Sequence, residues 1–221
     1  MKTSFFLILG TLFLPLNLVS CSGNNTNEEE INAGMDEKAI LEMGDISRVA
    51  TFSYDSAALS EDEIAGLYLM REEEKMARDV YAFFYAKFNV RTFGNITKSE
   101  NQHASAVLRL INNYGLTDPA KPAPGEFTNQ ELQELYNKFT TEAITAVDAL
   151  KVGALIEETD INDLMKLIAK TKNTNIQFVY SNLLRGSIFH LKAFTSVLKV
   201  RGVTYVPTVL SQEQYNAIIG K

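Results

Sequence analysis

The side chains best suited to chemistry in this sequence are carboxylates and histidines that interrupt apolar helical stripes. In LYLMREEEKMARDVYAFF, Glu74 falls at the three- and four-residue spacing of a buried face. The same spacing places Glu100 with His103, then Glu157, then His190 on three further apolar stripes, and the chain has only two histidines. A lone buried carboxylate is costly, so four such stripes predict a polar centre that holds a cation. Carboxylates combined with histidines suit iron, manganese or zinc.

The register of these candidate ligands leaves alternatives open. Glu73 and Glu158 also have apolar neighbours at helical spacing, so each could replace the glutamate beside it as a ligand. Glu100 could instead complete a capping box with Thr97 at a helix start. The two histidines could be hydrogen-bonded core residues, and Glu72 is expected on a solvated face.

Four long helices must position these side chains. Caps, glycines and prolines delimit helices at about residues 61–88, 93–115, 142–169 and 176–201. A short helix, capped by Thr128 with Glu131, precedes the third of them. The stretch LTDPAKPAPGEF cannot be helical, so residues 115–141 form a long crossover that lets the second and third long helices run parallel. The predicted fold class is an all-α four-helix bundle with one long crossover that contains a short extra helix.

The first residues predict export and lipidation. MKTSFFLILGTLFLPLNLVSC has one lysine and a short apolar run broken by Pro15, which indicates a signal peptide over residues 1–20 and not a membrane span. LVSC resembles a bacterial lipobox, and Cys21 is the only cysteine. We therefore expect a lipidated Cys21, a tether over residues 21–58, a helical domain over 59–205 and a tail over 206–221 that packs on the bundle.

Charge and composition limit the classes of partner that the protein is expected to bind. The formal net charge of -6 argues against nucleic acid. The lipid predicts attachment to a membrane at the cell envelope, on its periplasmic or surface side. A homodimer is left open, and no nucleophile constellation or phosphate-binding loop indicates a hydrolase.

Three phrases carry a family resemblance: LYLMREEEKMARDVY, GALIEETDINDL and LLRGSIFHLKAF. Together they resemble a bacterial family of ferritin-like domains of unknown function, over about residues 60–205. The spacing of Glu74, Ala77 and Tyr81, and the Glu-x-x-His of SENQH, resemble the rubrerythrin type of the ferritin-like superfamily. The resemblance implies a ferritin-like four-helix bundle that binds metal, and di-iron is the first expectation, with manganese or zinc as alternatives. It implies no particular reaction.

One position departs from the superfamily pattern. Ser187 stands where a glutamate is expected, three residues before His190. Asp160 lies one turn after Glu157 and could supply the missing carboxylate, or it could be a surface residue. Asp163 is expected to be solvated.

Three functions compete. The first is a di-metal redox protein that reacts with oxygen or peroxide at the cell envelope. In such a protein, Tyr81 and Tyr114 could hydrogen-bond to the metal ligands or carry a radical, or they could be bulky core residues. The second is a non-catalytic metal-binding module. The third is a surface lipoprotein scaffold without metal. Whether the protein is an enzyme is left open.

Overall fold

The computed structural model describes residues 58–220, and every regular element in that range is an α-helix. The elements are α2 (Glu61–Phe88), α3 (Arg91–Asn113), α4 (Gln130–Glu142), α5 (Ala146–Lys170), α6 (Thr174–Val200) and α7 (Gln212–Ile219). The all-α prediction is confirmed for this range. Cys21, the signal peptide and nearly all of the tether lie outside the described residues. Among the described helices, none has the length and apolar character needed to span a membrane.

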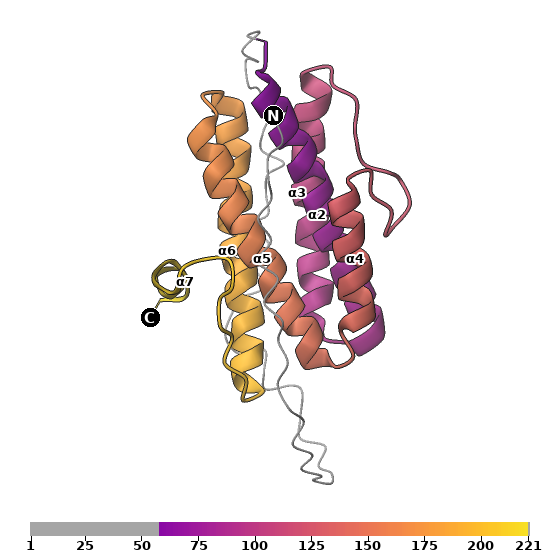
Figure 1. Cartoon of the computed structure of the whole chain (residues 1–221), viewed down its shortest axis with the longest axis vertical. Coiled ribbons are helices and arrows are strands. Elements are labelled where there is room, and N and C mark those ends of the chain that lie inside the picture. Colours follow the sequence, from indigo (N-terminus) through magenta and orange to yellow (C-terminus); the bar gives the residue numbers. More distant parts are fainter. Residues whose placement is uncertain (1–57, 221) are drawn as a thin grey trace. The chain divides into compact units, whose positions relative to one another are not determined.

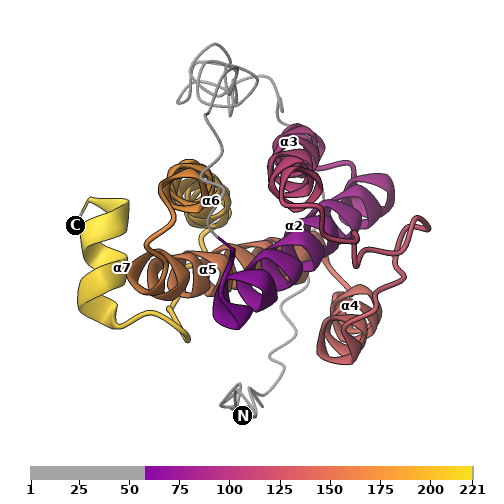
Figure 2. The ribbon, with the colours of Figure 1, turned by 90° about the horizontal axis from the view of Figure 1, so that it is seen from above.

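Two helical hairpins form the bundle. The α2–α3 hairpin turns at residues 89–90, and the α5–α6 hairpin turns at residues 171–173. The hairpins pack with α2 against α5 and α3 against α6. The chain passes from α3 to α5 through a long loop and α4, which packs on α2, so that α3 and α5 run in the same direction (Figure 1). Viewed from above, α4 lies beside α2, and α7 lies beyond the α5–α6 pair (Figure 2).

Side-chain caps fix where the helices begin. Ser60 with Glu63 starts α2 as predicted. Thr145 forms a capping box with Asp148, and α5 therefore begins later than the predicted residue 142. The cap of α4 is Asn129, because its side chain accepts from the backbone N–H of Glu131 and Leu132; the expected Thr128 cap was wrong.

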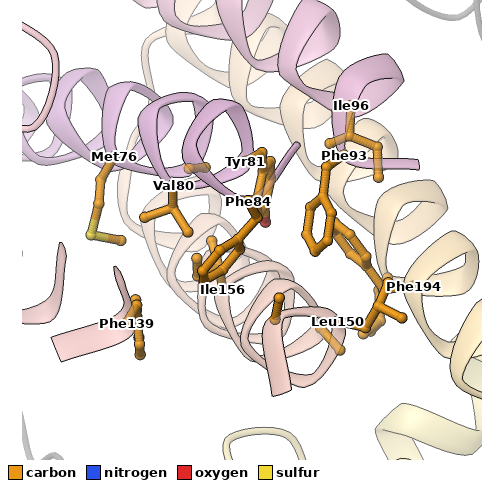
Figure 3. Packing of buried hydrophobic residues seen from close by; sticks show 14 of the residues in the cluster. Met76, Val80, Tyr81, Phe84, Phe93, Ile96, Phe139, Leu150, Ile156 and Phe194 are labelled. Atoms are coloured by element: carbon orange, nitrogen blue, oxygen red, sulfur yellow. The ribbon is translucent and has the colours of Figure 1, made fainter. Parts of the chain in front are cut away.

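Two apolar clusters pack the bundle, and the polar residues lie between them along the helices. One contains Tyr81, Phe84, Phe93 and Phe194, whose rings gather between the helices in Figure 3. The other contains Leu67, Met70, Val107, Leu110, Leu164 and Leu183. On α2, Glu74 falls between Met70 and Tyr81. On α3, Glu100 falls between Ile96 and Ala106, and on α6, His190 falls between Leu183 and Leu191. The fold thus encloses a polar layer within an apolar core.

The crossover loop covers the outer face of α2. Arg71 forms a two-point ion pair with Asp118, with N···O distances of 2.9 and 3.0 Å. Glu72 accepts from the backbone N–H groups of Thr128 and Asn129 at 2.6 and 3.0 Å. The predicted solvated position of Glu72 was therefore wrong, because the loop supplies amide donors that bury this carboxylate.

Lys75 anchors the same loop from the interior. It is buried and pairs with Asp79 at 2.7 Å, donates to two loop carbonyl oxygens, and lies 4.3 Å from the Phe127 ring centroid. Asp79 also accepts from the Gly125 N–H at 2.9 Å. The pair therefore fixes the crossover against α2 and leaves the inner face of that helix to the polar layer.

Candidate metal centre

The five side chains expected to converge do lie together in the polar layer. His103 Nδ1 is 2.8 Å from Glu100 Oε2 and 3.3 Å from Glu74 Oε2. His190 Nδ1 is 2.7 Å from Glu100 Oε1 and 3.5 Å from Glu157 Oε2. All five residues are buried, and the two imidazole rings stack with centroids 5.4 Å apart. Glu100 on α3 is therefore central, with one histidine near each of its oxygens.

Several atoms of this cluster lack hydrogen bonds despite their short separations. Glu100 Oε1 and His190 Nδ1 form an ion pair at 2.7 Å, although their geometry does not meet the criteria of a hydrogen bond. Glu74 Oε1 is also buried without a partner there. Carboxylate oxygens and imidazole nitrogens thus gather at one buried point, where a metal ion could replace the histidine protons.

The donor set fits a first-row metal. One ligand atom each from Glu100, His103 and His190 can be chosen so that all lie within 4.8 Å of one another. Ligand atoms that share one such ion lie at about 2.0–2.2 Å from it, and hence within roughly 4 Å of each other. These three residues therefore form a buried group that could hold a metal ion, with Glu74 and Glu157 beside it.

Helix register excludes the neighbouring candidates from this cluster. Glu158 points away from the centre and accepts from the Tyr205 hydroxyl and from the N–H groups of Thr208, Val209 and Leu210 at 2.6–3.1 Å. It fixes the C-terminal tail on α5. Thr97 is no helix cap, because α3 already begins at Arg91 and the Thr97 hydroxyl donates to the Phe93 carbonyl oxygen.

Asp160 lies beside the centre and pairs with Ser187. The Ser187 hydroxyl donates to Asp160 Oδ2, while Asp160 Oδ1 is buried without a hydrogen bond in the described range. Burial and the charges of Glu74 and Glu157 raise the pKa of Asp160 well above its usual value. The carboxylate thus faces the polar layer, and no hydrogen bond or ion pair joins it to either histidine in the described structure.

In the metal-free protein, protonated histidines balance the charge of the buried carboxylates. Burial favours neutral histidine, but the carboxylates of Glu100 and Glu157 raise the pKa of His190 to about 9. The pKa of His103 is raised in the same way by Glu100 and Glu74. Burial and the charge of Glu100 raise the pKa of Glu157 to about 7. Metal binding must therefore displace protons from the histidines near neutral pH.

Other polar side chains orient the ligands. The Tyr81 hydroxyl donates to Glu157 Oε1 at 2.6 Å, with its ring packed against Phe93 and Phe194. Ser99 Oγ lies 3.0 Å from His190 Nε2, a contact that helical periodicity does not predict. The Tyr114 hydroxyl donates to the side chain of Asn173 at the α5–α6 turn, so this tyrosine contacts that turn and not a candidate ligand.

Gly186 is a further functional position that periodicity does not reveal. A Cβ at this residue would lie 2.5 Å from Cε1 and 2.6 Å from Nε2 of His103. The glycine therefore lets the imidazole lie directly against the α6 backbone. Its only signal in the sequence is a residue of poor helix propensity inside a long apolar helix.

Comparisons with known proteins agree with this fold. Residues 63–221 match the family described as "Uncharacterized protein domain (DUF2202)". The protein MJ0754 of Methanocaldococcus jannaschii is 47% identical over 163 residues, which cover 73% of this chain and 88% of that protein. The crystal structure of MJ0754 matches with a TM-score of 0.74 at 45% identity, covering 77% of this chain and 98% of the other.

Proposed function

This chain belongs to the DUF2202 family, and we propose that it is a ferritin-like metalloprotein with a dinuclear centre, in which iron is the expected metal. The observation that carries the proposal is the contact of Glu100 Oε1 with His190 Nδ1. The two buried atoms form an ion pair at 2.7 Å, on helices that face each other across the core. A cation between them would satisfy both atoms.

The contacts suggest a role for each ligand. Glu100 has one oxygen near each histidine, which suits a carboxylate that bridges two ions. His103 with Glu74 would hold one ion, and His190 with Glu157 the other. A reduced iron pair held by these residues would supply electrons to oxygen or peroxide. Tyr81 keeps one oxygen of Glu157 engaged, and so fixes which oxygen of that carboxylate faces the metal.

Charge balance favours Asp160 as a sixth ligand. Three carboxylates leave two divalent ions with excess positive charge in the core, whereas a fourth neutralises them. The free Oδ1 of Asp160 is suited to this role, with Ser187 holding Oδ2. We expect Asp160→Asn to lose one metal per chain and Ser187→Ala to keep both. Full occupancy in Asp160→Asn would make that residue a bystander.

The decisive experiment is metal analysis of the full chain purified without chelators, followed by anaerobic loading with Fe²⁺. We expect two ions per chain, and loss of both in Glu100→Gln. Glu134→Gln on the exposed surface of α4 removes the same charge and should bind normally. A wild-type protein that neither contains nor takes up a first-row metal would refute the proposal and favour a scaffold.

Reactivity separates a redox protein from a storage or binding module. Consumption of oxygen or peroxide by the loaded protein, beyond the rate of free Fe²⁺, would support redox activity. Metal binding without consumption would leave a non-catalytic module.

We propose envelope attachment through a lipid on Cys21. Mass spectrometry of the membrane fraction would test this, and an unmodified Cys21 would refute it.

A further inference from the structure

The two histidines of the candidate centre are supported in different ways. The His190 ring has Nδ1 2.7 Å from Glu100 Oε1, and its Nε2 lies 3.0 Å from Ser99 Oγ. The His103 ring also has Nδ1 close to Glu100, at 2.8 Å, but its Nε2 edge lies against the α6 backbone at Gly186. A hydroxyl therefore contacts one ring where close packing contacts the other.

The contact with Ser99 bears on which nitrogen of His190 can bind a metal. A neutral imidazole carries one N–H, and a metal binds the nitrogen without it. When Ser99 Oγ accepts from the Nε2–H, the lone pair is on Nδ1, which lies 2.7 Å from Glu100 and 3.5 Å from Glu157. Histidines that bind metals commonly donate their other N–H in this way, which fixes both the tautomer and the orientation of the ring.

The Ser99 hydroxyl differs from other hydroxyls on α3. Thr97 donates to the Phe93 carbonyl oxygen at 2.7 Å, and Ser105 donates to the Asn101 carbonyl oxygen at 2.6 Å. Both of these bonds stay within the helix. Ser99 instead reaches a side chain on α6, and the residue that follows it on α3 is itself a candidate ligand. One turn of α3 therefore supplies a ligand and supports another.

We propose that Ser99 is the positioning residue of His190, and that its hydroxyl sets the affinity of one ion of the pair and not of the other. The inference deepens the proposed function and rests on it. The ion held by His190 with Glu157 depends on the Ser99 hydroxyl. The ion held by His103 depends instead on the packing of that ring against Gly186.

The test compares the two stepwise Co²⁺ affinities of the metal-free full chain, measured by competition with a coloured chelator. Ser99→Ala should weaken one binding step about tenfold or more and leave the other within about twofold of wild type. Ser99→Thr keeps the hydroxyl and should retain both affinities. Ser105→Ala is the matched control, because it removes a hydroxyl of the same helix that bonds to its own backbone.

Proton NMR of the Co²⁺-loaded chain supplies a readout that a general effect on folding would not move. A histidine bound through Nδ1 gives a paramagnetically shifted Nε2–H signal, and this proton exchanges with solvent more slowly when it is hydrogen-bonded. We expect one such signal from each histidine. In Ser99→Ala the His190 signal should exchange faster, and in Ser99→Thr it should exchange slowly again.

Each alternative outcome is distinct. Unchanged affinities in Ser99→Ala, or a signal that exchanges at the wild-type rate, would overturn the role of Ser99 while leaving the centre intact. Equal weakening of both binding steps, or the same weakening in Ser105→Ala, would reduce the effect to a general change in α3 and also overturn it. A threonine variant as weak as the alanine variant would exclude the hydroxyl as the support of His190. If wild-type protein gave no Co²⁺ absorption band, the proposed function would fail, and this inference with it.

Discussion

Replacing Gly186 by alanine should weaken metal binding by crowding His103. The new Cβ would lie 2.5 Å from Cε1 of the imidazole, and ordinary contact begins at 3.4 Å. The ring must therefore retreat by roughly 1 Å, whereas a metal site tolerates about 0.2 Å. Misplacing an otherwise intact ligand typically costs about 10–100-fold in metal affinity, and we expect a loss in that range.

The effect on folding should be small, which separates the two roles of this residue. Overpacking costs about 1–3 kcal/mol, but alanine regains about 1 kcal/mol of helix propensity over glycine. Gly153→Ala is the matched control on α5, because its Cβ would meet the Phe194 ring at 2.8 Å and touch no ligand.

Competition titration with a coloured chelator would measure affinity, and urea unfolding of the metal-free protein would measure stability. Gly186→Ala should lose affinity and Gly153→Ala should not, at similar stability. Wild-type affinity in Gly186→Ala would show that the position of His103 against α6 does not matter for the metal, and the assignment of that ligand would fall.

Four further predictions concern protons, a hydrogen bond and the tail. Metal affinity should rise by at least about 100-fold from about pH 6 to about pH 8, because His190 alone must lose a proton held with a pKa of about 9, and His103 must lose another; calorimetry showing a flat profile would contradict this. The raised pKa of His190 should also stabilise the metal-free fold, by about 3 kcal/mol at pH values below the ordinary histidine pKa of 6.5. This contribution should be lost as the pH rises through 9, and urea unfolding across that pH range would detect the loss. Tyr81→Phe should keep both metals but lower metal-free stability by about 1–3 kcal/mol, since it removes the bond to Glu157, and an unchanged unfolding midpoint would count against that bond. Glu158→Gln should expose the residues after 205 to limited proteolysis while the centre still loads; protection equal to wild type would show that other contacts hold the tail.

The convergence of the five candidate ligands could be predicted because helical period fixes direction. Neighbouring residues on a helix differ by about 100°, so a glutamate on an apolar stripe and the one beside it face different surroundings. Glu74 lies with the histidines while Glu73 does not, and Glu157 lies with them while Glu158 binds the tail. The apolar spacing favoured Glu74 and Glu157 but left Glu73 and Glu158 as alternatives, and the contacts of the folded chain decide both pairs.

The burial of two other acidic residues could not be predicted from helical periodicity. Glu72 and Asp163 fall off the apolar stripes, which ordinarily means exposure to water. Both are buried by segments distant in sequence or by neighbouring helices: the crossover loop supplies amides to Glu72, and the packing of α2 on α5 encloses Asp163. Periodicity describes one helix at a time, so it carries no information about a loop that folds back onto the polar face.

The distribution of satisfied and unsatisfied charge argues that the core is built for cations. Where this fold buries a carboxylate for structure, it satisfies it fully: loop amides meet Glu72, tail amides and a phenol meet Glu158, and Lys75 meets Asp79. Within residues 58–220, the unpaired buried side-chain atoms belong to Glu73, Glu74, Glu100, Asp160, Asp163, Tyr180 and His190. Glu74, Glu100, Asp160 and His190 among them lie at or beside the candidate centre. Removing charge from such a group often stabilises a metal-free fold, so these side chains are poor stabilisers of folding by themselves. A bound cation would offset that cost.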